Sequence, residues 1–276
     1  MLLSAASFSV MVASAKYLGG RIPAAQIVLV RTLFAIVATY AFLYQAGISP
    51  RGNRQGLLAL RGLLGFGALL CLYSALPRLP LAEATLIQYM NPIFVTVLAV
   101  PILGERVGRA SLLALAVAFC GLVFVAKPAL LFGVGDALDP VGVGLGLTAA
   151  LLSSLAYISV RKLVETEHRM VIVLYFPLVS APLALLLVLG NYVAPTLAEW
   201  GLLGLIAVFT QLGQIFLTRG LAQEKAGRAS TVGYAQVLFA AGWGALLFGD
   251  LPDVWSLVGA LLILAAVVTI ARSKER

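Results

Sequence analysis

The chain contains two copies of one unit, related by a shift of 145 residues. At this shift Tyr89 aligns with Tyr234 and Gly104 aligns with Gly249. Few side chains are identical, so the alignment of the segment ends, which holds over nearly the whole chain, is the stronger observation. A repeat of this length restricts the fold to two copies of one architecture.

The apolar content identifies the solvent around both copies. Hydrophobic residues make up 62% of the chain and charged residues only 11%, with a mean hydropathy of +1.04. Soluble domains contain about 45–50% apolar and about 25% charged residues. A soluble helical protein has no core large enough to hide so much apolar surface, so we expect helices that span a lipid bilayer. Internal repeats in such chains are typical of secondary transporters.

Apolar stretches of about 20 residues, the length that crosses a bilayer, predict ten membrane-spanning helices. Turn residues separate them, as in Pro77-Arg78-Leu79-Pro80. The predicted spans are residues 2–18, 24–46, 56–76, 81–103, 110–126, 140–162, 170–190, 198–219, 228–248 and 254–272.

These spans divide into two five-helix repeats, residues 1–127 and 140–276, joined by a linker loop at residues 128–139. Because five is an odd number, the second copy enters the membrane from the opposite side. The predicted fold class is therefore an all-α polytopic membrane protein, with ten transmembrane helices as two inverted five-helix repeats. Such a repeat has a pseudo-two-fold axis in the membrane plane, which gives a physical basis for alternating access.

Basic residues are divided unevenly between the two sides of the predicted bundle. Of the 19 Lys and Arg residues, 13 lie on the side that holds both termini, 4 on the other side, and 2 within spans. The positive-inside rule then predicts both termini in the cytoplasm, with the protein in the cell (inner) membrane. The net charge of +8 is therefore a topology signal rather than a footprint for nucleic acid.

Polar side chains inside the spans mark a candidate substrate cavity, because such groups are costly in lipid. In the fourth span Gln88 and Asn91 share a helical face, with Tyr89 beside them. Pro92 is a candidate hinge, since proline removes a backbone donor. The alternative is that these groups only tie helices together. The candidate substrate-binding residues are Tyr73, Gln88, Tyr89, Asn91, Tyr157, Gln211, Gln214, Tyr234, Gln236, Trp243 and Arg31.

Two arginines lie within predicted spans. Arg31 lies up to about two turns inside its span, and three interpretations stay open: it snorkels to the interface, it holds a substrate carboxylate, or it fixes helices through their carbonyls. Arg61 is closer to the cytoplasmic end, so we expect it to snorkel. Trp243, in the middle of its span, either lines the cavity or packs between helices.

No acidic residue falls at the predicted membrane midplane, because all lie in loops or near span ends. Proton- or sodium-coupled carriers of cations usually have one there, so facilitated movement is favoured over tight ion coupling. The single histidine, His168, lies in a loop, and we expect it to be solvated. Cys71 and Cys120 are isolated thiols that indicate packing. We predict no metal site, no cofactor and no catalytic residue.

The segment 75–106 resembles the signature of the drug/metabolite transporter superfamily of the EamA type. It combines a turn at Leu79-Pro80, a proline-bearing span with Asn91-Pro92, and an outgoing Leu103-Gly104-Glu105. A degenerate second copy occupies residues 221–250. The resemblance covers the whole chain, and within the superfamily it is strongest to the bacterial aromatic amino-acid exporters.

The resemblance implies a cavity between the two halves, lined by spans 1–4 and 6–9, with spans 5 and 10 peripheral. We therefore expect a secondary transporter that exports amino acids, aromatic or apolar, or similar small metabolites by alternating access. Its partners would be a small-molecule substrate and the lipid bilayer, with no nucleic acid, and it would act as a monomer.

The main alternative is a multidrug exporter of the same fold. Small multidrug members carry a glutamate in the first helix, and the first span here has no acid. An intramembrane enzyme would need a nucleophile with a base, paired carboxylates or a metal cluster, and the sequence supplies none of these. A non-transporting scaffold or receptor is the third alternative.

Overall fold

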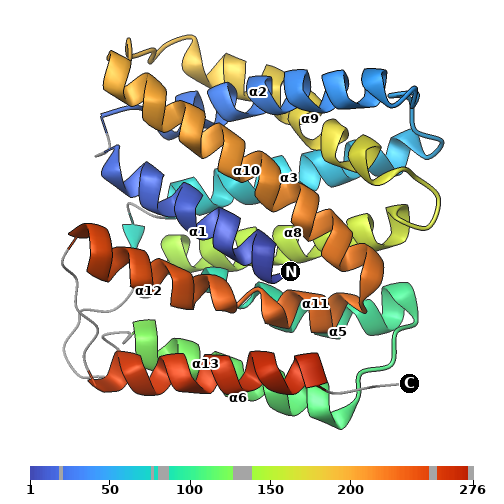
Figure 1. The fold of residues 1–276 in the computed structure, drawn as a ribbon, viewed down its shortest axis with the longest axis vertical. Helices are drawn as coiled ribbons and strands as arrows, with labels where there is room; N and C mark the ends of the chain where they lie inside the picture. Colours follow the sequence, from blue (N-terminus) through green and yellow to red (C-terminus); the bar gives the residue numbers. More distant parts are fainter. Residues whose placement is uncertain (19–20, 76–77, 80–86, 127–138, 249–253, 273–276) are drawn as a thin grey trace.

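The computed structural model describes residues 1–18, 21–75, 78–79, 87–126, 139–248 and 254–272. The regular elements of these ranges are helices that lie roughly parallel in one elongated bundle (Figure 1). They are α1 (Leu2–Tyr17), α2 (Ala24–Gln45), α3 (Gln55–Ala75), α5 (Asn91–Leu103), α6 (Arg109–Ala126), α8 (Pro140–Leu163), α9 (Arg169–Val188), α10 (Leu197–Gln223), α11 (Ala226–Val232), α12 (Ala235–Phe248) and α13 (Val254–Arg272).

The packing of the helices has the symmetry that the sequence repeat predicts. A shift of 145 residues places α1, α2, α3, α5 and α6 on α8, α9, α10, α12 and α13. In space α1 packs against α10 as α8 packs against α3, and α1 packs against α12 as α8 packs against α5. Helices α2 and α9 pack against each other, as do α6 and α13, at the two extremes of the bundle in Figure 1. The pseudo-two-fold axis therefore passes through both of these pairs.

The outer surface of the bundle is apolar. Helices α2, α8, α9 and α10, and residues 55–72 of α3, are long and apolar enough to cross a membrane by length and composition. Large aliphatic side chains such as Leu257, Leu261 and Leu264 of α13 are exposed. Because soluble monomers rarely expose such continuous apolar surface, this face of the protein suits lipid.

Polar residues define where several helices begin and end. Asp139 caps α8 by accepting from the N–H groups of Val141 and Gly142, and this contact, together with Arg78, holds the pKa of Asp139 below its usual value. Thr196 and Glu199 form a capping box at the start of α10. Gly104 ends α5 with a φ of 67°, which is in the left-handed region.

The ten predicted spans correspond to these helices. Most ends agree within two residues, and α10 extends furthest beyond its prediction, to Gln223 instead of residue 219. The predicted linker at 128–139 and residues 81–86 of the fourth span lie almost entirely outside the described residues, so the domain boundaries stay a prediction.

The spans predicted at residues 81–103 and 228–248 are both interrupted by a turn. Helix α5 begins at Asn91 after a turn at Tyr89-Met90, and a turn at Gly233-Tyr234 separates α11 from α12. The two turns overlap at Tyr89 and Tyr234, which are equivalent residues of the two copies. Broken helices of this kind are a recurring feature of transporter binding sites.

Backbone hydrogen bonds tighten at both breaks from the i→i−4 to the i→i−3 pattern. Gly233 donates to the carbonyl of Ser230, and Met90 donates to that of Ile87. Pro92 stands just inside α5, but Val237 takes its place in the second copy, which breaks all the same. Proline is therefore not the common cause of the two breaks.

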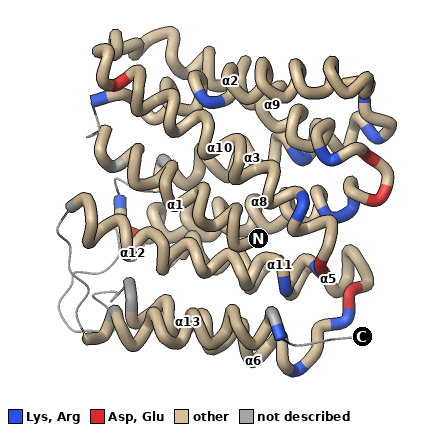
Figure 2. The backbone as a smooth tube through the Cα atoms, in the orientation of Figure 1, with Lys and Arg blue, Asp and Glu red and all other residues tan. Residues whose placement is uncertain are grey.

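More of the charged residues lie at one end of the bundle than at the other (Figure 2). We call the end at which α1 begins and α13 ends the terminal end, and the other the opposite end. The pair Arg161–Glu105, 3.1 Å apart, lies at the terminal end, and the pair Arg78–Asp139, 3.3 Å apart, lies at the opposite end. The terminal end includes the loops 46–54, 104–108, 164–168 and 224–225, and the opposite end includes the loops 21–23 and 189–196.

Candidate substrate site

The two repeat-related tyrosines meet at the helix breaks. The fully buried Tyr234 donates its hydroxyl to the carbonyl of Tyr89 at 2.8 Å, and the two rings stack with centroids 5.8 Å apart. This carbonyl accepts from the hydroxyl because the N–H of Ile93 bonds to Met90 instead. Since the partners are 145 residues apart, the contact lies on the pseudo-two-fold axis, at the boundary between the halves.

Arg61 lies inside the bundle, which corrects the prediction that it snorkels. The residue is only 4% exposed, and its Nη2 donates to Oε1 of Gln214 at 2.9 Å. Its guanidinium carbon lies 4.7 Å from the centroid of the Phe176 ring, in a cation–π contact. Its Nε and Nη1 atoms are buried without a hydrogen-bond partner among the described residues.

Glycines beside Arg61 explain its depth. A Cβ atom at Gly62 would lie 2.8 Å from Val179, and one at Gly65 would lie 2.8 Å from Phe176. The missing side chains let α9 approach α3 closely and cover the arginine. The spacing of glycines in the third span is the sequence signal that could have revealed the burial of Arg61.

Arg31 borders a small internal void. The residue is 7% exposed, its Nε is buried without a partner, and its guanidinium makes no hydrogen bond to a described residue. The void measures about 10 Å³, room for roughly one water molecule. Burial disfavours the snorkelling interpretation of Arg31. The void is lined by Arg31, Thr32, Ala35, Val173, Phe176, Pro177, Thr210, Gln211 and Gln214.

Several predicted site residues converge around this void. Gln211 borders it while its Nε2 donates to the hydroxyl of Thr39 at 2.6 Å, which ties α10 to α2. Gln214 borders it and also accepts from Arg61. Tyr157 of α8 does not line the void, and it packs against the core cluster that includes Leu217 of α10.

None of the other predicted site residues whose side chains the structure describes lines the void. Trp243 donates from Nε1 to the hydroxyl of Ser9 at 3.1 Å, which favours a helix contact between α12 and α1. Asn91 is buried at the start of α5, and Oε1 of Gln88 is buried without a partner among the described residues. Gln236 is half-buried on α12. Tyr73 belongs to α3, but its side chain lies outside the part that the structure describes.

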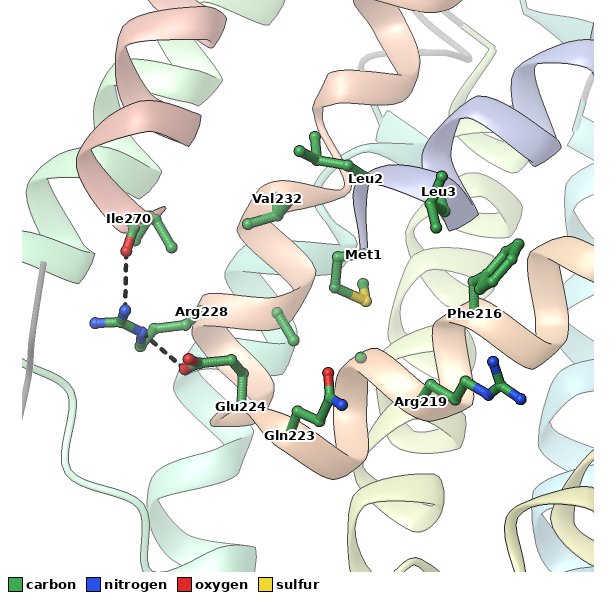
Figure 3. Close-up of a pocket in the computed structure, with 12 residues that line it drawn as sticks. Met1, Leu2, Leu3, Phe216, Arg219, Gln223, Glu224, Arg228, Val232 and Ile270 are labelled. Atoms are coloured by element: carbon green, nitrogen blue, oxygen red, sulfur yellow. Dashed lines mark hydrogen bonds and ion pairs between the residues drawn. The ribbon is translucent and has the colours of Figure 1, made fainter. Parts of the chain in front are cut away.

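A larger open pocket of about 510 Å³ lies at the terminal end, between α1, α10, α11 and α13 (Figure 3). On one wall Arg228 donates to Glu224 at 3.1 Å and to the carbonyl of Ile270 at 2.8 Å. None of the residues predicted to line the cavity borders this pocket. Polar groups from both halves converge in the buried polar cluster around Arg31 and Arg61, which makes this cluster the candidate substrate site.

The two ends of the molecule differ where the repeat would make them alike. Gly220, Glu224 and Val232 line the open pocket. Their counterparts at the opposite end, Ala75, Leu79 and Ile87, form a closed hydrophobic cluster that packs against Val143, Leu145 and Leu147. The two halves therefore hold different local conformations in one molecule.

Within the described ranges no three His, Cys, Asp or Glu residues come together to hold a metal ion. The described cysteines are free thiols, and His168 caps α9 by accepting from the N–H of Met170 at 3.3 Å.

Known proteins match the chain over its whole length. A model of the EamA-like transporter family matches twice, at residues 1–127 and 140–272. The pseudopaline exporter CntI of Pseudomonas aeruginosa is 35% identical over 276 residues, covering 99% of this chain and 95% of that protein. The S-adenosylmethionine uptake transporter of Rickettsia bellii is 26% identical, covering 100% and 93%.

A solved structure, titled only as the crystal structure of a protein, has the same fold. It superposes with a TM-score of 0.82 at 18% identity, covering 98% of this chain and 96% of that one. The family model, the relatives and the two inverted five-helix halves agree. The chain belongs to the EamA-like transporter family, and it is a multi-pass membrane transporter of small metabolites rather than an enzyme.

Proposed function

We propose that this transporter exports amino acids or similar small metabolites across the cytoplasmic membrane by alternating access. The observation that carries the proposal is the pair of symmetry-related helix breaks, joined by Tyr89 and Tyr234 on the axis between the halves. Two inverted halves that meet at one site can exchange conformations and open that site to either side in turn.

The export direction and the topology have separate support. The pseudopaline exporter, an export protein by its name, shares 35% of its residues with this chain. The described basic residues cluster at the terminal end, which supports a cytoplasmic position for both termini in the inner membrane. A single chain contains both halves, which supports a monomer as the working unit.

Aromatic or apolar amino acids are the proposed substrate class. Tyr89 and Tyr234 supply aromatic surface at the helix breaks, and stacking on such surface would bind an apolar side chain. A cationic drug would meet two buried arginines there, so the multidrug alternative is disfavoured. The carboxylates of the described residues lie at helix ends and in loops, which supports facilitated movement without a coupled ion.

Exchange in proteoliposomes tests the function. Vesicles loaded with unlabelled phenylalanine, leucine, histidine or glutamate should take up the labelled counterpart faster than protein-free vesicles. An imposed proton gradient should change the rate by less than about twofold if no carboxylate carries a proton. Rates equal to those of protein-free vesicles for all four amino acids would reject amino-acid transport. Efflux of ethidium with no amino-acid exchange would support the multidrug alternative instead.

A further inference from the structure

Arg31 and Arg61 are two buried cations without a carboxylate partner in the described part of the chain. The described ion pairs join Arg21 to Glu199, Arg78 to Asp139, Arg161 to Glu105 and Arg228 to Glu224. All of these pairs lie at or near the ends of helices. A guanidinium inside a membrane bundle is costly unless a counter-charge or dipoles compensate it.

We propose, on the basis of the transport function proposed above, that Arg31 and Arg61 together bind a carboxylate of the transported substrate. The structure links the two residues through shared neighbours. Gln214 and Phe176 line the void beside Arg31, and the same two side chains contact the guanidinium of Arg61. Both arginines thus face one cluster made by α2, α3, α9 and α10.

The unsatisfied atoms of the cluster point to an anion. Nε of Arg31, Nε and Nη1 of Arg61 and Oγ1 of Thr210 are buried without a partner among the described residues. The arginine atoms can only donate, and the hydroxyl can donate as well. A carboxylate accepts several such hydrogen bonds at once, and guanidinium groups match its geometry in bidentate pairs.

The present contacts of Arg61 are the ones that a substrate would replace. An amide oxygen and an aromatic face are weak partners for a guanidinium compared with a carboxylate. The void has room for only about one water molecule, so Gln214 or Phe176 must move when a carboxylate enters. In the closed cluster Gln214 and Phe176 therefore make the contacts with Arg61 that the substrate carboxylate would replace.

Both arginines of the site belong to the first half of the repeat. At the shift of 145 residues Arg31 corresponds to Phe176 and Arg61 to Ile206. The second half supplies an aromatic and an aliphatic side chain where the first half supplies charge. The molecule therefore has one anion site rather than two, and its substrate binds with its carboxylate toward α2 and α3.

Binding by matched pairs of compounds tests the carboxylate. The probes are phenylalanine with phenethylamine, histidine with histamine, and citrate, each added to purified protein in detergent while its apparent Tm is measured. A ligand of the folded state raises the Tm. At least one carboxylate should raise the Tm of the wild type, and its amine partner without the carboxyl group should not.

Substitutions then locate the site. Arg31→Gln and Arg61→Gln should weaken carboxylate binding roughly ten- to hundredfold, the worth of one charged hydrogen bond. Arg31→Lys and Arg61→Lys, which keep the charge, should weaken it less and guard against loss of folding. Arg51→Gln, at an exposed position of the terminal end, is the matched control and should leave binding unchanged.

The outcomes separate this site from the transport function. Carboxylate binding that needs both arginines, without exchange in vesicles, would support the site and reject the function. Amino-acid exchange that is unchanged in Arg31→Gln and Arg61→Gln would support the function and overturn the site. The site would also be overturned if no carboxylate raised the Tm of the wild type by more than it raised the Tm of the Gln variants.

Discussion

At the residue scale, the hydroxyl of Tyr234 forms a hydrogen bond that joins the two helix breaks. It reaches a carbonyl of the first break that a tightened turn has released from its usual donor. A buried carbonyl that loses its partner is destabilising, so this one hydroxyl contributes to the stability of both turns.

Tyr234→Phe should therefore lower the free energy of unfolding by about 1–3 kcal/mol, because the carbonyl of Tyr89 stays buried without a donor. The measurement is the apparent Tm in a fixed detergent, with and without substrate. Tyr89→Phe is the control, since its hydroxyl makes no hydrogen bond to a described residue while its ring stays stacked. Equal losses of stability in the two variants would show that ring packing, and not the hydrogen bond, matters here.

The sequence revealed some of the clustered residues and missed others for physical reasons. Gln211, Gln214 and Arg31 stand out because polar groups inside an apolar span are rare. Arg61 was missed because its distance from the span end suggested snorkelling, whereas its burial depends on how closely α9 approaches. Phe176 is an ordinary apolar residue in sequence, and only its place over the guanidinium gives it a role.

At the scale of the element, the two breaks form without a common proline. The first break lies directly before Asn91-Pro92, whereas the second copy has Val237 in place of the proline. The tightened turns have in common their position on the axis, where each copy packs against the other. Tertiary packing, which a sequence pattern does not reveal, therefore decides where these helices stop.

Pro92→Ala should consequently preserve the first break. We expect transport within about twofold of the wild type and a change in the free energy of unfolding of about 1 kcal/mol or less. Exchange in proteoliposomes and the apparent Tm measure the two quantities. A loss of exchange with unchanged stability would show instead that the proline acts as the hinge that its sequence position suggests.

Helices α6 and α13 pack most closely where α6 carries a glycine. A Cβ atom at Gly121 would lie 2.7 Å from the carbonyl oxygen of Gly259 and 2.9 Å from the side chain of Ile263. Gly121→Val should therefore force the two helices apart and lower the free energy of unfolding by about 1–3 kcal/mol. Gly144→Val is the matched control, because a Cβ at Gly144 in α8 meets no atom within 4 Å. Equal Tm values for the two variants would contradict the close packing.

At the scale of the whole molecule, the repeat predicted more than any single residue did. The ten spans, their grouping into halves and the inversion follow from span length and from an odd number of helices per copy, and the structure confirms them. Hydropathy does not reveal how each helix is rotated or how deeply a side chain lies, because neighbouring helices set both. The open pocket at one end and the closed cluster at the other were for that reason not predictable.

The topology can be tested with two cysteines at opposite ends. In a Cys71→Ala, Cys120→Ala background, Tyr192→Cys at the opposite end should react with a membrane-impermeant maleimide in intact cells. Glu165→Cys at the terminal end should react only after the cells are permeabilised, because the positive-inside rule places its loop in the cytoplasm. The reverse pattern would invert the proposed orientation.

The stacked tyrosines also have a geometric meaning for a carrier that changes shape. Points on a rotation axis stay in place when two symmetric bodies trade positions, and each ring lies only about half of the 5.8 Å separation from that axis. Neighbours farther from the axis must exchange partners in every transport cycle, whereas Tyr89 and Tyr234 can keep each other throughout. The pair would then be a contact that stays the same whichever side of the membrane the carrier faces.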